Sequence, residues 1–454
     1  MSLAAAPPVM PSPNHPDRFR YEGYAIDAGR GEVSCHYSTG DHQFTERFAF
    51  DPAGDWANPA VEAAVRLLFL LAGVSYYKTA AAPVIDLGHN ASSAPERAFL
   101  TRFYQEGLGE FAYRNGLDLS ELSVEGPDRA STAVDYTPLA NRPLIPFGGG
   151  IDSIVTVSAI RAKAPDAALC IVHPPGDRFA AIEGAAAVTG LPVAYVEREI
   201  DPLVRSGEHG FLNGHVPITA VITATALVAA VLAGRDAVVL SNEWSASVPT
   251  VVHQGHPVNH QWSKSSDFES LFAERLAASL GSKMAVFSYL RNRTELWVAQ
   301  QFAGLPAFHP VFRSCNRSFA QDPTQRLDHW CGRCDKCCFI DLILSSYMEA
   351  AELRSIFDGH EPLDDPQLEE QFRTLLGLGV GVKPFECVGD TYECRAAVRL
   401  AAARPDRKAN PLLARLVAAV EATDDAGALS TAELLVPVGR HYIPDRYAPA
   451  DLLV

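Results

Sequence analysis

The feature that most constrains this chain is a glycine run between an apolar strand pattern and a helical pattern. The apolar residues 144–147 lead into Gly148-Gly149-Gly150, and residues 151–158 then place apolar side chains at helical spacing. Glycines let the backbone approach an anion closely, and the first turn of a helix offers free N–H groups and the positive end of its dipole. The segment therefore predicts a phosphate-binding site at the start of a helix.

Strand and helix patterns alternate on the carboxyl side of this loop. Strand patterns at 168–172, 193–196 and 237–240 are separated by helix patterns at 179–189 and 216–233. Such alternation is typical of a parallel sheet covered by helices on both faces. The stretch 216–233 is the most apolar of the chain, but it carries three threonines and no flanking anchors. It therefore predicts a buried helix rather than a membrane span.

The chain of 454 residues is long enough for several domains. Residues 1–17 carry five prolines and predict a disordered tail. Residues 18–140 combine strand patterns with two helix patterns, 58–72 and 94–115, and predict an α+β cap. Residues 141–345 predict the α/β nucleotide domain, and 346–454 a mainly helical region interrupted by a loop near 377–390. The expected fold class is thus α/β.

Several side chains around the glycine loop suit nucleotide binding. We expect Phe147 and the three glycines to shape the loop, Ser153 to donate to a phosphate oxygen, and Asp152 to hold Mg²⁺ or to cap the helix. Asn242 and Glu243 follow the strand at 237–240, and ligands of parallel sheets bind at the carboxyl ends of strands. The alternatives are an ordinary capped helix after a glycine turn and an ordinary exit from a strand.

Four cysteines have the spacing of a metal site. Cys315 is followed by Cys331, Cys334 and Cys337, and turns of this spacing bring thiolates within reach of one tetrahedral zinc ion. An iron–sulfur cluster is the other metal that suits such thiolates. Cys338 is an alternative ligand or a bystander. We predict a structural zinc held by the first four.

Two further segments hold reactive side chains. The polar stretch 253–269 contains His260 and Lys264, and Lys264 would neutralise a phosphate or a carboxylate. The loop 383–390 places Glu386 beside Cys387, and a thiol serves as a base when its pKa is lowered. Lys383 would lower that pKa if it lies close by. A solvated loop and a structural turn with a buried cysteine are the alternatives. Further candidates for holding anions are Arg291, Arg293 and Arg313.

Charge and composition narrow the class of partner. The formal net charge of −16 disfavours a broad nucleic-acid footprint, because phosphate binding needs clustered Lys and Arg. The N-terminus lacks the basic start and apolar core of a signal peptide. We therefore expect a cytoplasmic protein that binds neither nucleic acid nor a membrane.

The glycine loop resembles the PP-loop of ATP pyrophosphatases, Ser-Gly-Gly-x-Asp-Ser, with Gly148 in place of the first serine. This resemblance implies that ATP is cut between its α and β phosphates and that AMP is transferred to a substrate oxygen. The cysteine motif is similar to that of the PP-loop enzyme that builds 7-cyano-7-deazaguanine, in which it binds structural zinc.

The order of the motifs resembles the MurL family. These motifs are Phe-Gly-Gly-Gly-Ile-Asp-Ser, Ser-Asn-Glu-Trp-Ser, Cys-Gly-Arg-Cys-Asp-Lys-Cys and Pro-Phe-Glu-Cys-Val-Gly. The resemblance implies ATP-dependent epimerisation of the terminal L-glutamate of UDP-MurNAc-L-Ala-L-Glu through a carboxyl adenylate, in peptidoglycan synthesis. A MurD-type ligase would supply this substrate. The candidate catalytic residues are then Asp152, Lys264, Cys387, Glu386 and His260.

Other classes remain open from the sequence. A PP-loop ligase or amidating enzyme would act on a small carboxylate, but the large C-terminal region favours a larger substrate. A tRNA thiolase would need a basic face, which the net charge disfavours. A zinc-stabilised nucleotide-binding module without activity is the last alternative, and the nucleotide product formed from ATP separates it from all PP-loop enzymes.

Overall fold

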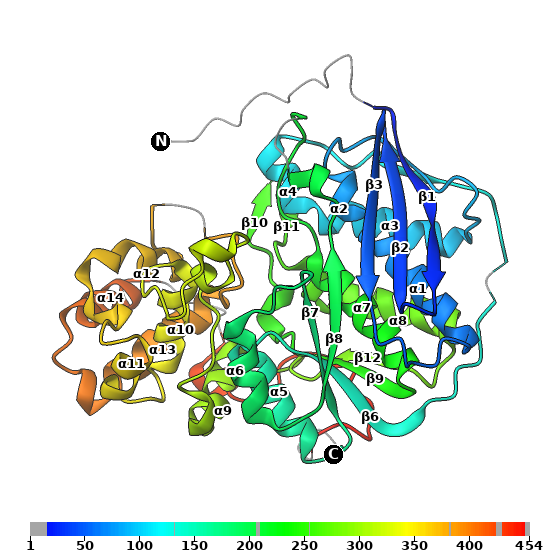
Figure 1. Cartoon of the computed structure of the whole chain (residues 1–454). Helices are drawn as coiled ribbons and strands as arrows, with labels where there is room; N and C mark the ends of the chain where they lie inside the picture. Colours follow the sequence, from blue (N-terminus) through cyan, green and yellow to red (C-terminus); the bar gives the residue numbers. More distant parts are fainter. Residues whose placement is uncertain are drawn as a thin grey trace.

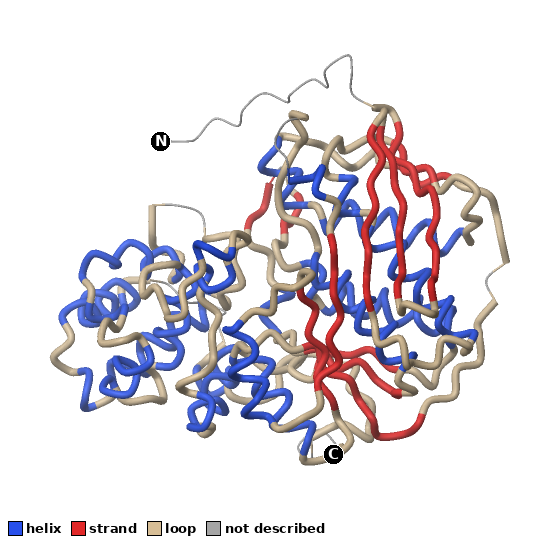
Figure 2. Tube along the Cα trace, viewed as in Figure 1, coloured by secondary structure: helices blue, strands red, loops and turns tan. Residues whose placement is uncertain are grey.

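The computed structural model describes residues 16–130, 132–205, 209–253, 255–380, 383–423 and 429–449. Its centre is a ten-stranded sheet with the strand order β12-β9-β6-β7-β8-β3-β2-β1-β4-β5 (Figures 1 and 2). Most of its strand pairs are parallel, so the expected α/β fold class is confirmed. The expected disordered tail falls almost wholly outside the described residues.

The parallel half of the sheet contains the four strands that the sequence predicts and a fifth, at Ala285–Ser288, that it did not indicate. Its members are β6 (Leu139–Pro146), β7 (Ala168–His173), β8 (Val193–Glu199), β9 (Arg235–Leu240) and β12 (Ala285–Ser288). Strand β9 is buried at every position, as expected of a strand with helices on both sides. Strand β6 lies between β7 and β9, so the glycine loop leaves from the middle of this half.

The strands of the expected cap continue the same sheet. Strands β1 (Arg18–Asp27), β2 (Glu32–Thr39) and β3 (His42–Ala49) form an antiparallel meander, and β3 pairs with β8 through Phe48 and Arg198. Two short strands, β4 (Val84–Asp86) and β5 (Ser123–Glu125), extend the far edge. The N-terminal segment is thus joined to the nucleotide half by backbone hydrogen bonds.

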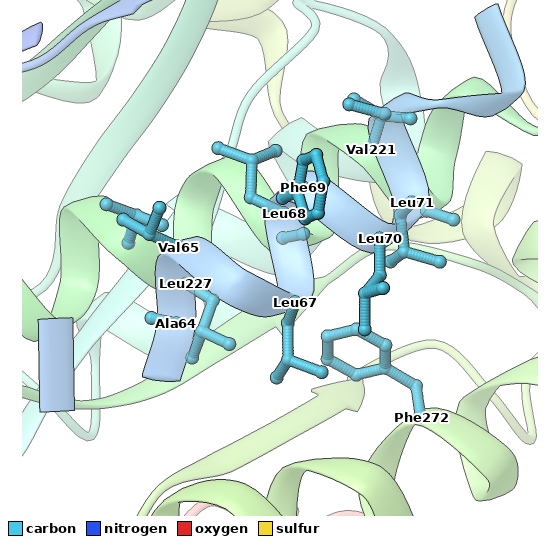
Figure 3. Close-up of a cluster of buried hydrophobic side chains, with 14 of the residues drawn as sticks. Ala64, Val65, Leu67, Leu68, Phe69, Leu70, Leu71, Val221, Leu227 and Phe272 are labelled. Carbon is cyan, nitrogen blue, oxygen red and sulfur yellow. The ribbon is translucent and has the colours of Figure 1, made fainter. Parts of the chain in front are cut away.

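One face of the sheet is covered by helices from both halves. They are α1 (Pro59–Ala72), α2 (Val74–Tyr77), α3 (Ala94–Gly107), α4 (Gly109–Asn115), α7 (Ile218–Leu232) and α8 (Ser266–Leu280). The expected helix 94–115 is divided in two, with Leu108 outside the helical range. Figure 3 shows Leu67 and Leu70 of α1 beside Leu227 of α7 and Phe272 of α8.

The first of these helices begins where its sequence dictates. Asn58 accepts a hydrogen bond from the N–H of Ala60, and Pro59 occupies the first turn. By length and composition the helical segment Pro59–Tyr77 is, among the described residues, the one that could cross a membrane, but 83% of its most apolar window is buried inside the fold.

The other face carries a second core. It is covered by α5 (Ile151–Arg161), α6 (Ala180–Thr189), α9 (Glu295–Ala303), and the C-terminal helices α10 (Asp335–Leu344), α11 (Ala350–Ile356), α12 (Glu369–Leu375), α13 (Thr391–Ala403), α14 (Pro411–Glu421) and α15 (Thr431–Leu434). Figure 1 shows α10 to α14 grouped at one side of the sheet. The chain from α10 onward is mainly helical in the described residues, and a loop lies between α12 and α13.

Candidate active site

The chain order of the parallel strands reverses beside β6. The chain passes from β6 to β7 and β8 on one side, and then to β9 on the other. Ligands of such sheets bind outside the carboxyl ends of the strands at this switch point. Residues 147–150 leave the carboxyl end of β6, and Ser241, Asn242 and Glu243 leave that of β9. The structure therefore brings the two predicted nucleotide segments to neighbouring strands.

The backbone of the glycine loop is held in a left-handed turn. Phe147 is buried and its N–H donates to the carbonyl of Cys170 at 2.9 Å. Gly149 has φ +75°, and a Cβ there would lie 3.1 Å from the carbonyl oxygen of Ala181. At Gly148, in contrast, no described atom lies within 4 Å of such a Cβ. Gly149 is thus required by packing and Gly148 faces open space.

The start of helix α5 is open to an anion. Gly150 is the N-cap and provides no side-chain hydrogen bond to the first turn, so Asp152 is not a cap. The Ser153 hydroxyl donates to the carbonyl of Gly150 at 3.0 Å. Since the first N–H groups of a helix have no partner within it, this end is available for a phosphate.

Asp152 lies in the first turn of α5 with an unsatisfied carboxylate. Its Oδ1 is buried and has no hydrogen-bond partner among the described residues. Burial raises the pKa of this carboxyl to about 6, against the positive charges of Lys336 and Lys264. The negative charges of Glu243 and of the Cys387 thiolate add to the rise. An orphaned buried carboxylate oxygen is a suitable ligand for a hard cation.

The loop after β9 is held by hydrogen bonds to the end of β12 and within itself. The Asn242 N–H donates to Ser288 Oγ at 2.5 Å, and that hydroxyl donates to the carbonyl of Asn242 at 2.6 Å. The Glu243 carboxylate accepts from the N–H of Ala246 at 2.9 Å and caps the short helix Trp244–Ser247. A contact of Asn242 or Glu243 with a nucleotide stays a prediction.

The arginines proposed for anions are engaged by protein groups. Arg291 is 2% exposed and donates to Glu269 Oε2 at 2.8 Å. It also donates to the carbonyls of Glu243 and Lys264, at 3.0 and 2.6 Å. Arg291 therefore ties three segments of the site together.

The loop between α12 and α13 places Cys387 beside the predicted polar segment. Lys264 Nζ lies 2.9 Å from Cys387 Sγ, although 123 residues separate them. His260 also interacts with this sulfur and favours its ionised form. Burial alone would raise the pKa of a thiol, but Lys264, His260 and Lys336 outweigh it and lower the pKa of Cys387 to about 5. Three of the predicted catalytic residues, Lys264, His260 and Cys387, therefore lie together, and the sulfur of Cys387 is a thiolate.

Two lysines have roles that the sequence did not predict. Lys383 donates to the carbonyl of Gly389 and does not touch Cys387, so the expected role of Lys383 is wrong. Lys336 of helix α10 instead donates to the backbone carbonyl of Cys387. Its charge also acts on Asp152. In the sequence Lys336 lies between Cys334 and Cys337, and no pattern there links it to Cys387.

Glu386 lines a cavity together with Pro384 and Phe385 of the same loop. Its Oε1 accepts from Asn316 Nδ2 at 3.0 Å, and burial together with the Cys387 charge raises the pKa of its carboxyl. The cavity has a volume of about 490 Å³ and lies between helix α4, the start of α10 and helix α12. Its lining residues are Arg114, Asp335, Glu370, Gln371, Thr374, Pro384, Phe385 and Glu386.

The four predicted metal ligands converge. The ligand sulfurs of Cys315, Cys331, Cys334 and Cys337 all lie within 4.8 Å of one another. Cys337 Sγ is 3.6 Å from Cys331 Sγ and 3.4 Å from Cys334 Sγ. Cys338, the alternative ligand, is outside this group and is buried in the core.

Comparison with known proteins identifies the family. The family model of the MurL N-terminal domain matches residues 10–289, and that of the MurL C-terminal domain matches residues 311–431. The chain belongs to the MurL family. The N-terminal match contains the glycine loop, His260 and Lys264, and the C-terminal match contains Cys387 and the four clustered cysteines. The candidate site of this MurL-family chain is therefore assembled from both family domains.

Relatives similar to this chain span nearly its whole length. A protein of Salinispora tropica is 36% identical over 446 residues, which cover 96% of this chain and 95% of the relative. A protein of Xanthomonas oryzae pv. oryzae is 35% identical over 433 residues, covering 94% and 95%. Both are named UDP-N-acetyl-alpha-D-muramoyl-L-alanyl-L-glutamate epimerase. No solved structure matches the chain.

Proposed function

We propose that this MurL-family chain inverts the α-carbon of the terminal L-glutamate of UDP-MurNAc-L-Ala-L-Glu and consumes ATP to AMP and pyrophosphate. The observation that carries the proposal is a low-pKa thiolate, Cys387, close to an open phosphate site at the start of α5. The relatives named as epimerases of this substrate support it. A MurD-type ligase that adds L-glutamate would supply the substrate.

Activation of the carboxylate comes first. A glutamate α-proton is hard to remove while the adjacent carboxylate is charged. In the PP-loop reaction a carboxylate oxygen attacks the α-phosphorus of ATP, the bond to the β-phosphate oxygen breaks, and pyrophosphate leaves. The open end of α5 and the glycine loop suit the phosphates. Lys264 and Lys336 supply positive charge between this end and Cys387.

Asp152 fits a magnesium ion, because its buried orphan oxygen is a ligand of the kind that Mg²⁺ prefers. When bound, the ion would neutralise phosphate charge. The pKa of Asp152 is raised to about 6, so burial makes its ionised form less favourable than that of an ordinary aspartate. A cation bound beside the carboxylate would favour the ionised form again.

Proton removal follows activation. With the carboxylate converted to an adenylate, the Cys387 thiolate takes the α-proton: the C–H bond breaks, an S–H bond forms, and the electron pair moves onto the acyl oxygen. A solvent-derived proton then adds to the opposite face. Water hydrolyses the adenylate and releases AMP.

The four clustered cysteines fit a single zinc ion. Sulfurs about 2.3 Å from a tetrahedral zinc lie about 3.8 Å apart, close to the 3.4 and 3.6 Å found here. An iron–sulfur cluster, whose ligands bind different irons, would hold the sulfurs further apart. We propose that the metal stabilises the fold and takes no part in the chemistry.

The decisive experiment mixes the protein, ATP, Mg²⁺ and UDP-MurNAc-L-Ala-L-Glu in D₂O. We expect AMP and pyrophosphate, D-glutamate in the product, and deuterium at the glutamate α-carbon only when hydrolysable ATP is present. ADP as the nucleotide product, or deuterium exchange without ATP, would contradict the adenylate route. An amide or other adduct of the carboxylate would indicate a ligase.

A further inference from the structure

A buried carboxylate of the N-terminal half contacts His260, the histidine that interacts with Cys387. Glu110 of helix α4 is 5% exposed, and its Oε2 lies 2.5 Å from His260 Nδ1. Its Oε1 accepts from Arg114 Nε, also at 2.5 Å. Because Nδ1 faces Glu110, the other ring nitrogen of His260 is left to interact with Cys387, which favours the charged ring. Carboxylate, imidazole and thiolate thus form one chain of contacts.

We propose that Glu110 is a positioning residue that holds His260 as a cation against the Cys387 thiolate and thereby keeps the base of the epimerisation ionised. The proposal rests on the proposed function for the role of Cys387 in catalysis. It deepens that function by assigning a residue that lies 277 positions away in the chain and in the other family domain.

The neighbouring charges identify His260 as the cation. Burial opposes a charge on His260, but its hydrogen bonds to Cys387 and Glu110 outweigh burial and raise its pKa to about 9. The ring of His215 lies 4.1 Å from that of His260, centroid to centroid. Burial and the His260 charge lower the pKa of His215 to about 4, so His215 is a neutral ring that lies tilted against a charged one.

The charged groups around His260 and Cys387 differ in whether they favour or disfavour the Cys387 thiolate. The charges of Lys264 and Lys336 favour the thiolate. The negative charges of Asp152 and Glu386 interact with the Cys387 thiolate, and like charges disfavour one another. The groups around Glu110 are His260, Arg114 and His215, and together they outweigh burial and lower its pKa. Glu110 is therefore ionised, and His260 is protonated beside the thiolate between about pH 5 and pH 9.

The distance between Glu110 and His260 fits a hydrogen bond better than shared coordination of a metal ion. The ligand atoms of Glu110, His215 and His260 lie within 4.8 Å of one another. Two ligand atoms about 2.0–2.1 Å from a tetrahedral zinc would, however, be about 3.3 Å apart. The 2.5 Å between Glu110 and His260 is a charge-assisted hydrogen bond instead.

The arrangement has a clear chemical consequence. When Cys387 takes the substrate's α-proton, a thiolate–imidazolium pair becomes a thiol beside an imidazolium, and the electron pair of the broken C–H bond moves to the acyl oxygen. His260 keeps its proton throughout, because Glu110 stabilises the charged ring. Without the carboxylate, His260 would lose its proton at lower pH and the thiolate would lose one of its cations.

The test measures the thiol directly. The purified full-length protein is treated with iodoacetamide across a pH series, and mass spectrometry follows alkylation of the peptide that contains Cys387. In the wild type we expect the thiolate midpoint near pH 5. In Glu110→Gln we expect it at about pH 6–7, which at pH 6 slows alkylation roughly two- to tenfold. Glu106→Gln, an exposed change four residues earlier in α3, is the matched control and should leave the midpoint unchanged.

A double-mutant cycle separates positioning from general damage. If Glu110 acts through His260, Glu110→Gln adds no further rise of the midpoint to that of His260→Gln. Equal midpoints in wild type and Glu110→Gln, or additive rises in the double variant, would overturn the proposal. A second metal ion per chain that Glu110→Gln abolishes would do the same. Circular dichroism of each variant verifies the fold, and His260→Gln alone still tests the pair if Glu110→Gln fails to fold.

The alkylation curve does not depend on catalysis, so the two proposals fail separately. Suppose that the midpoint is raised in Glu110→Gln but deuterium exchange is normal in Cys387→Ser. Glu110 would then keep its positioning role, and Cys387 would not be the base of the reaction. An unchanged midpoint together with lost exchange in Cys387→Ser would do the reverse.

Discussion

Replacing Gly149 by alanine tests whether the glycine loop holds phosphate through close backbone approach. Gly149 has φ +75°, and an alanine Cβ would lie 3.1 Å from the Ala181 carbonyl oxygen and 3.2 Å from Ile182 Cα. Both neighbours are backbone atoms at the start of α6, so neither can move as a side chain would. The substitution must therefore shift the loop, the helix or both.

The size of the effect follows from two opposing terms. A left-handed conformation costs an alanine about 1–2 kcal/mol, and the reduced freedom of the unfolded chain returns about 0.4–1 kcal/mol. The tight contacts add to the cost, so we expect the free energy of unfolding to fall by about 1–2 kcal/mol. A displaced loop loses hydrogen bonds to phosphate, and each loss of about 1.4 kcal/mol weakens ATP binding tenfold.

The assay compares this variant with Gly148→Ser. At position 148 no described atom lies within 4 Å of an added Cβ, and a serine there recreates the hydroxyl of the PP-loop pattern. We expect Gly148→Ser to bind ATP at least as well as the wild type, and Gly149→Ala to raise KM for ATP at least tenfold. Stability is followed by denaturant unfolding. A wild-type KM in Gly149→Ala, or equal damage in both variants, would refute the reasoning.

Three further predictions concern the other parts of the site. Asp152→Ala should abolish AMP formation while leaving circular dichroism unchanged, and AMP release at the wild-type rate would remove Asp152 from nucleotide chemistry. Elemental analysis should find about one zinc per chain held by the four clustered cysteines, and chelation should lower stability; no metal, or an iron–sulfur absorbance band, would contradict this. Cys387→Ser should keep AMP formation but lose deuterium incorporation by about a hundredfold or more, whereas exchange at the wild-type rate would make Cys387 structural.

Local patterns were sufficient for the centre of the fold. The strand, glycine loop and helix at 144–161 are adjacent in sequence, so apolar runs and glycines predicted them directly. The cysteine ligands are close in sequence as well, apart from Cys315, and their convergence was predictable from spacing. The prediction of a helix at 94–115 missed the break after Gly107 because the polarity pattern runs through it.

Contacts between distant segments were beyond the sequence patterns. The pairing of β3 with β8 joins Phe48 to Arg198, and no local signal specifies which strand a meander will meet. Glu110 and Arg114 form an i,i+4 ion pair on one helix, and that spacing gives no sign of a second partner. The second contact of Glu110, with His260, spans 150 residues.

Closeness in sequence led to the wrong prediction of which lysine lowers the pKa of Cys387. Lys383 lies four residues from Cys387, yet its ammonium turns to the Gly389 carbonyl. Lys264 lies 123 residues away and contacts the sulfur at 2.9 Å. Cys387 was therefore predictable as a candidate base, but the groups that lower its pKa depend on the tertiary structure.

The cysteine cluster connects the two reacting centres, which explains how a metal without a chemical role would still govern activity. On one side, Arg313 lies two residues before Cys315, and its backbone N–H donates to the Gly149 carbonyl at 3.2 Å. On the other, Lys336 lies between Cys334 and Cys337 and donates to the Cys387 carbonyl. Displacement of the cluster would therefore disturb the phosphate loop and the thiolate loop together. Metal removal from a folded protein should lower AMP formation and α-proton exchange in parallel, whereas a metal that served only one step would uncouple them.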